Sequence, residues 1–167
     1  MKIENKALRE AYNLLEKATP LGDADCGSIC SAVCCGDTLG DSMELFPYEK
    51  ELFESLDGFT VTDGETPLVK CNGSCARCER PLACRIYPLF PLVVEEDGKE
   101  KIRVIYDPRA TAACPLVKQK ARLDRRFTRA VRRAGKYLLR DEKSAEHLRK
   151  TSEFLKELIE LEMKLGI

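Results

Sequence analysis

The sequence lacks an excess of either charge and has no long apolar run, and each absence excludes a class of function. Its 167 residues carry 28 basic and 28 acidic side chains, so no overall field draws the chain to nucleic acid or a membrane. No apolar run approaches the roughly 20 residues needed to cross a bilayer. Charges also interrupt the first 10 positions, where a signal peptide would be apolar. We therefore expect a cytoplasmic protein with no membrane segment, in which thiols stay reduced.

Histidine is nearly absent, which limits the catalytic chemistry available. His147 is the only one, so a Ser-His-Asp triad has a single possible base, and no nucleophile elbow is present. Glycine-rich phosphate loops of the Walker and dinucleotide types are also missing. We expect His147 at the surface of a helix, away from any metal.

Cysteine, by contrast, is abundant and grouped. The chain has 9 cysteines, of which 8 fall into two clusters. The first cysteine cluster is Cys26, Cys30, Cys34 and Cys35, and the second is Cys71, Cys75, Cys78 and Cys84. Thiols at such spacing can converge on one metal ion, whereas scattered cysteines pack in cores. In a reducing compartment this grouping favours metal binding over disulfides, with Cys114 a candidate of second rank.

The spacing leaves the number and kind of metal sites open. Thiolates are soft ligands that select zinc, copper(I) or iron–sulfur clusters. If the first cluster is helical, Cys26, Cys30 and Cys34 share a face, and Cys35 diverges from Cys34 by about 100°. The 8 clustered thiols fill either two four-thiolate sites or one site with several thiols buried. We predict zinc or an iron–sulfur cluster as the cofactor.

The second cluster ends in a distinctive segment, Arg80–Pro88, which reads Arg-Pro-Leu-Ala-Cys-Arg-Ile-Tyr-Pro. Together with the Cys34-Cys35 pair, it makes residues 24–90 similar to the YkgJ-type cysteine-cluster proteins, described as zinc- or iron-chelating. Two details differ from that family: the first cysteines are three residues apart instead of two, and Cys75-Ala-Arg-Cys78 replaces Cys-x-Ile-Tyr. The resemblance implies metal chelation. The group also contains the flagellin lysine N-methylases, so an iron–sulfur enzyme of methyl-transfer type is the alternative.

Three residues of this segment are candidates to surround the thiolates: Arg80, Arg85 and Tyr87. Arginine beside a thiolate offsets its negative charge and donates hydrogen bonds to sulfur. The alternative for Arg80 and Arg85 is an ordinary surface ion pair.

The remaining pattern predicts an α+β fold, mainly helical, in a single domain over residues 1–167. A small cysteine-rich metal-binding core spans about 23–115, with one β-hairpin, and an antiparallel helix pair spans about 115–165. The predicted helices are 2–18, 47–56 and 115–140, followed by a break with capping residues at 141–144 and a last helix that ends at 165. Short strands are predicted at 59–61 and 68–69. Valine, isoleucine and tyrosine around an Asp-Gly turn predict the hairpin, 89–95 with 101–106.

One stretch of the predicted helix pair is strongly basic. Residues 118–140 contain 10 basic side chains opposed only by Asp124. Such a face suits an acidic protein or nucleic acid, and a nucleic-acid module is the weaker alternative function. We expect instead that the acidic last helix balances it, because the charges of the chain sum to zero. An acidic protein that binds this basic face is kept as a further alternative.

Overall fold

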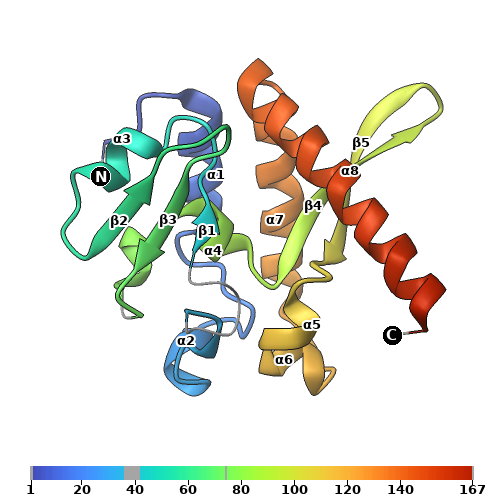
Figure 1. Cartoon of the computed structure of the whole chain (residues 1–167), viewed down its shortest axis with the longest axis horizontal. Helices are drawn as coiled ribbons and strands as arrows, with labels where there is room; N and C mark the ends of the chain where they lie inside the picture. The colour runs from blue at the N-terminus through green and yellow to red at the C-terminus, as the bar shows by residue number, and fades with distance from the viewer. Residues whose placement is uncertain (1, 36–41, 74, 167) are drawn as a thin grey trace.

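The structure is a computed structural model that describes residues 2–35, 42–73 and 75–166. Within these ranges 8 α-helices accompany two small antiparallel sheets, which confirms the predicted α+β class with more helix than strand. No helix in the described ranges is long and apolar enough to cross a membrane. The two sheets lie on opposite sides of the molecule, with α7 (Arg125–Leu138) between them (Figure 1).

The two-stranded sheet is the predicted hairpin. β4 (Leu89–Glu96) pairs antiparallel with β5 (Lys99–Tyr106) along the full length of both strands. Asp97 and Gly98 join them with φ of 56° and 68°, the left-handed pair that a type I′ turn requires. The Asp-Gly signal is thus confirmed.

Helices cover this hairpin on two sides. α7 packs across both strands, and Gly135 comes so close that a Cβ there would lie 2.7 Å from the Cβ of Pro91. α8 (Glu142–Leu165) lies against β4, where the Oγ of Ser152 accepts the N–H of Val93 at 2.9 Å. This contact gives the N–H of Val93 an acceptor outside the β4–β5 ladder.

The three-stranded sheet leads toward the cysteines. β1 (Met43–Glu44) and β2 (Phe59–Thr62) pair antiparallel with the central β3 (Leu68–Cys71). α3 (Lys50–Glu54) packs against β2 through the fully buried Phe53. Both predicted strands are present, and β3 ends on the first cysteine of the second cluster.

The main core lies where α1 (Lys6–Leu15), α4 (Leu82–Ile86), the hairpin and α7 meet. Its side chains with no exposed surface are Leu8, Ala11, Leu15, Leu82, Phe127, Val131, Ala134, Leu148 and Leu155. α1 is shorter than the predicted helix over 2–18, because Asn5 caps its first turn by accepting the N–H of Leu8 at 3.0 Å.

The predicted helix over 115–140 is wrong as one continuous element. It consists of α6 (Pro115–Lys118) and α7, separated by a connection in which Lys120 has a left-handed φ of 51°. Asp124 starts α7 afresh, because its carboxylate accepts the N–H of Arg126 at 2.5 Å. The N–H of Asp124 also donates to the carbonyl of Pro20 at 2.9 Å, which fixes the break against the N-terminal segment.

α8 folds back from the short turn after α7, with the chain directions of the two helices opposed (Figure 1). The two helices then diverge, and α8 crosses in front of β4. The inner face of α7 packs on α1 and the hairpin instead. A break is present but ends earlier than predicted, because α8 begins at Glu142, where the carboxylate of Asp141 caps the helix by accepting the N–H of Ser144 at 3.0 Å.

Candidate metal centre

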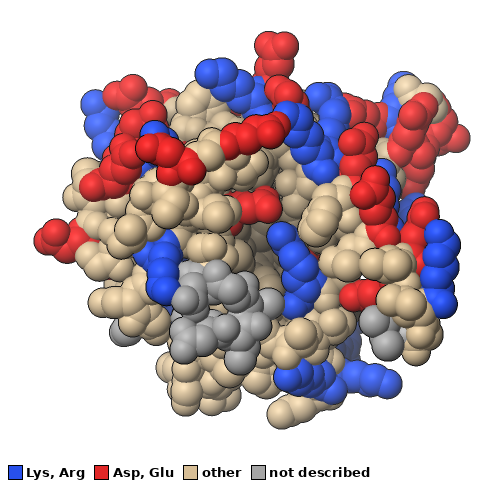
Figure 2. Space-filling view, viewed as in Figure 1, with Lys and Arg blue, Asp and Glu red and all other residues tan. Residues whose placement is uncertain are grey.

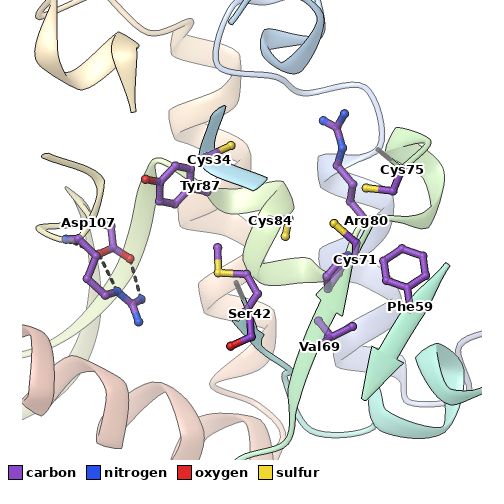
Figure 3. Close-up of a pocket in the computed structure, with 13 residues that line it drawn as sticks. Cys34, Ser42, Phe59, Val69, Cys71, Cys75, Arg80, Cys84, Tyr87 and Asp107 are labelled. Carbon is purple, nitrogen blue, oxygen red and sulfur yellow. Dashed lines mark hydrogen bonds and ion pairs between the residues drawn. The ribbon is translucent and has the colours of Figure 1, made fainter. Parts of the chain in front are cut away.

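Both cysteine clusters reach one cavity. It has a volume of about 120 Å³, and four of the thiols line it: Cys34, Cys71, Cys75 and Cys84. In Figure 3, Cys71, Cys75 and Cys84 lie toward Arg80, whereas Cys34 lies beside Tyr87. Segments far apart in the sequence therefore present sulfur to a common space.

Local chain geometry explains how the second cluster reaches this cavity. Cys71 ends β3, and the positive φ of Gly73, 80°, allows the sharp turn that leads to Cys75. Pro81 precedes α4, and Cys84 lies one turn inside that short helix. The start of α4 is held by Glu49, whose carboxylate accepts the N–H of Leu82 at 2.8 Å.

The first cluster does not form the single helical face expected from its spacing. α2 (Cys26–Ile29) is only one turn long, and η1 (Val33–Cys35) is a separate turn of 3-10 helix. Ser31 and Ala32 between them have left-handed φ values of 54° and 50°. The shared face predicted for three cysteines is therefore wrong, and of these three only Cys34 lines the cavity.

The other cysteines lie elsewhere. Cys26, Cys30 and Cys78 do not line the cavity, and Cys78 is exposed. Cys114, between α5 (Ala110–Ala113) and α6, is buried in a small cluster with Tyr87, against which Cys34 packs. The side chain of Cys35 lies outside the part of the chain described.

The described thiols line a common space without meeting at a point. Among residues 2–35, 42–73 and 75–166, no three Cys, His, Asp or Glu side chains are placed to hold a metal ion. Within these ranges eight cysteines form no disulfide. Metal binding at this cavity would thus require the thiols to draw inward.

The rest of the lining is apolar wall with a few charged or polar groups. The apolar side chains are Met43, Phe59, Val69 and Pro81, and the polar ones are Ser42, Arg80, Tyr87, Asp107 and Arg109. Apolar walls exclude water, so charges inside the cavity interact more strongly than they would in solvent.

Arg80 ties the two cysteine clusters together. Its guanidinium donates to both carboxylate oxygens of Asp25, each at 2.7 Å. This pair lowers the pKa of Asp25, and the hydrogen bond to Asp25 followed by that to Cys75 raises the pKa of Arg80. Arg80 therefore joins the start of α2 to the second cluster and places a positive charge beside Cys75.

Arg85 does not line the cavity. It is 3% exposed and donates to the backbone carbonyls of Arg80 and Cys78, each at 2.8 Å. Its guanidinium also lies 4.3 Å from the ring centre of Tyr12. Arg85 thus holds the backbone of η3 (Arg77–Glu79) and the turn after it, and does not face the cavity.

Tyr87 has an unsatisfied hydroxyl. The residue is 8% exposed and lines the cavity, and its oxygen has no hydrogen-bond partner among the described residues. Burial, followed by the nearby thiols of Cys114 and Cys34, raises its pKa. A buried hydroxyl left unpaired is costly, so this one is suited to meet an occupant of the cavity.

Three contributors to this region carry no sequence signal that singles them out. Glu49 is completely buried beneath α4, and Asp107 and Arg109 form a pair with contacts of 2.9 and 2.7 Å at the cavity wall. Asp25, the partner of Arg80, was also missed, and its place directly before the first cysteine is the one signal that could have indicated it. His147 is half-buried against Phe46, with ring centres 4.6 Å apart, so its expected surface position is wrong.

The basic residues of 118–140 were expected to be balanced by the acidic last helix, and their ion pairs differ from that expectation. In the described part of the chain, the only ion pairs made by its residues join Arg126 to Asp124 and to Asp23, so no ion pair links α7 to the acidic side chains of α8. The face shown in Figure 2 mixes Lys and Arg with Asp and Glu, in keeping with the zero net charge.

Comparison with known proteins identifies no relative that would inform the role of this cavity. The likeness to the YkgJ-type proteins rests on the segment Arg80–Pro88 and the cysteine pattern alone. Function is therefore inferred from the cavity and the side chains around it. No protein-family model matches the chain, and no curated protein or solved structure matches it.

Proposed function

We propose that this chain is a metal-binding protein whose centre occupies the cavity lined by Cys34, Cys71, Cys75 and Cys84. The observation that carries the proposal is that two cysteine clusters, distant in sequence, contribute to one cavity. Four thiolates are the donor set of structural zinc sites and of iron–sulfur clusters. Scattered structural cysteines would have no reason to share a space.

The size of the cavity favours a group of several atoms over a single ion. A water molecule needs about 10–15 Å³ of such volume, whereas this cavity has about 120 Å³. A lone zinc ion would leave most of that space empty unless the walls closed on it. We therefore favour an iron–sulfur cluster, with zinc as the competing occupant.

The charges around the cavity suit a negatively charged thiolate centre. Arg80 lies beside Cys75, and Arg109 lines the opposite wall while paired with Asp107. Cations next to thiolates offset the charge that would otherwise accumulate in an apolar space. Such a centre would also link η1, β3 and α4 covalently through metal, which stabilises the cysteine-rich half of the fold.

The test is elemental analysis and visible absorbance of protein purified without oxygen. We expect iron with sulfide and a brown colour in the wild type. C71S and C84S, at the cavity, should each lose most of the metal. C78S removes an exposed thiol outside the cavity and is the matched control, which should retain it.

Two results would contradict the proposal. Metal at no more than trace level, with every thiol reactive, would refute metal binding. Equal loss of metal in C78S and C84S would refute the location. One zinc per chain and no iron would keep the thiolate site and overturn the preference for a cluster.

A further inference from the structure

The C-terminal half of α8 extends away from the rest of the protein, and several of its apolar side chains are exposed to solvent. Leu155 is completely buried, but Phe154, Leu161 and Leu165 are 51%, 52% and 63% exposed. Figure 1 shows this end of the helix extending past the hairpin, and Figure 2 shows uncharged surface between charged side chains along it. Isolated apolar residues on a surface are ordinary, so their arrangement decides whether they matter.

These side chains form a continuous seam. Phe154, Leu158, Leu161 and Leu165 follow one another at steps of four, three and four residues. That is the repeat by which two helices pack along each other in a coiled coil. Leu158 is half-buried, and the seam starts where the fold stops covering α8.

We propose that this seam, Phe154–Leu165, packs antiparallel against the same seam of a second copy of this chain. In one register all four apolar positions find a partner. Phe154 then faces Leu165 of the second copy, and Leu158 faces Leu161 of the second copy. The two-fold symmetry of such a pair repeats both contacts.

The charged residues beside the seam favour the antiparallel orientation of the two copies over the parallel one. With Phe154 and Leu161 as d positions and Leu158 as an a position, Glu157 and Lys164 occupy g positions. In the antiparallel register Glu157 faces Lys164 of the second copy, and the symmetry makes this attraction twice. In a parallel pair Glu157 would face Glu162 of the second copy, which is repulsive.

Nothing within the described chain uses these charges. Among the described ion pairs, α8 contributes only Glu146, Arg149 and Lys150, all in the half that packs on the body. Glu157 and Lys164 are exposed. They are therefore available to a partner helix, while Leu155 keeps α8 anchored on its own core.

The proposal predicts a weak, reversible dimer, because only four layers of side chains are buried. Sedimentation equilibrium over a range of concentrations should give a monomer–dimer transition. L161Q should shift the dissociation constant upward at least about tenfold, since it places an amide in the central layers. K156E, on the opposite face of the helix, is the control and should leave the constant unchanged.

Charge reversal tests the direction. E157K should weaken the antiparallel dimer about fivefold, because it places a second positive charge opposite Lys164 of the other copy. The double variant E157K/K164E should restore the affinity. Tighter association of E157K would show a parallel pair and overturn the register. Monomeric wild type at all concentrations up to about 1 mM would overturn the proposal itself. Neither readout depends on metal in the cysteine cavity.

Discussion

Glu49 and Tyr12 form a hydrogen bond in the interior, where the hydroxyl of Tyr12 donates to a carboxylate with no exposed surface. The same carboxylate accepts the backbone N–H of Phe46 at 2.7 Å and that of Leu82 at 2.8 Å. Glu49 therefore joins α1, the segment before α3 and the start of α4. Since α4 carries Cys84, this buried group supports the cavity wall without touching the cavity.

Replacing Glu49 should change how stability depends on pH. Burial raises the pKa of its carboxyl from 4.5 to about 7, although its hydrogen bonds act in the opposite direction. The native state then holds the proton more tightly than the unfolded state. Glu49 therefore lowers the stability as pH rises from about 4.5 to 7, by up to about 1.4 kcal/mol per pH unit.

The measurement is urea unfolding of wild type and E49Q across that pH range in the same metal state. E49Q removes the titration, so the difference in unfolding free energy between the two proteins should change steadily with pH. Y12F, which removes one hydrogen bond that lowers the pKa of the carboxyl, is the companion variant and should extend the fall in stability to higher pH. Parallel curves for wild type and E49Q would exclude this titration.

Local signals predicted the elements that depend on neighbouring residues only. The Asp97-Gly98 turn fixed the hairpin, and the cap at Asp141 fixed the start of α8. The break before α7 was missed because it depends on a contact distant in sequence, the bond from Asp124 to Pro20. An apolar stripe cannot reveal a backbone bond between segments so far apart along the chain.

The sequence indicated which cysteines group together, but not which of them share the cavity. Spacing identified both cysteine clusters, but not that Ser31 and Ala32 turn Cys34 away from the other first-cluster cysteines. The turn at Gly73 and the anchoring of α4 by Glu49 likewise decide that Cys71 and Cys84 face the cavity. Those are consequences of tertiary packing, which single-residue spacing does not encode.

His147 should titrate far below the ordinary range. Burial, followed by the positive charge of Arg109, lowers its pKa from 6.5 to about 4, so the native imidazole is neutral near neutral pH. Its contribution to stability is complete above about 6.5 and is lost as pH falls toward 4. Because His147 is the only histidine, one imidazole signal in a proton NMR titration reports it without ambiguity. A midpoint near 6.5 would contradict the burial.

The contact between Arg80 and Asp25 should contribute to the stability of the folded protein, so the effects of replacing the two residues should not be additive. R80K keeps the charge but loses the two-point contact, and D25N keeps the shape but loses the charge. Each should lower the unfolding free energy by about 1–3 kcal/mol, as expected for a charged hydrogen bond that is partly buried. The double variant should cost less than the sum of the two, by about 1 kcal/mol. Additive losses would mean that the contact contributes nothing of its own.

The unpaired hydroxyl of Tyr87 gives the sharpest test of an occupied cavity. In the metal-free protein Y87F removes a buried oxygen without a described partner, so the unfolding free energy should rise by about 1 kcal/mol. In the metal-loaded protein the hydroxyl can bond to the occupant or its sulfur ligands, and the gain should disappear. Y106F, at a tyrosine that is 47% exposed, is the control and should change neither form. Equal stabilisation by Y87F with and without metal would show that Tyr87 does not meet the centre.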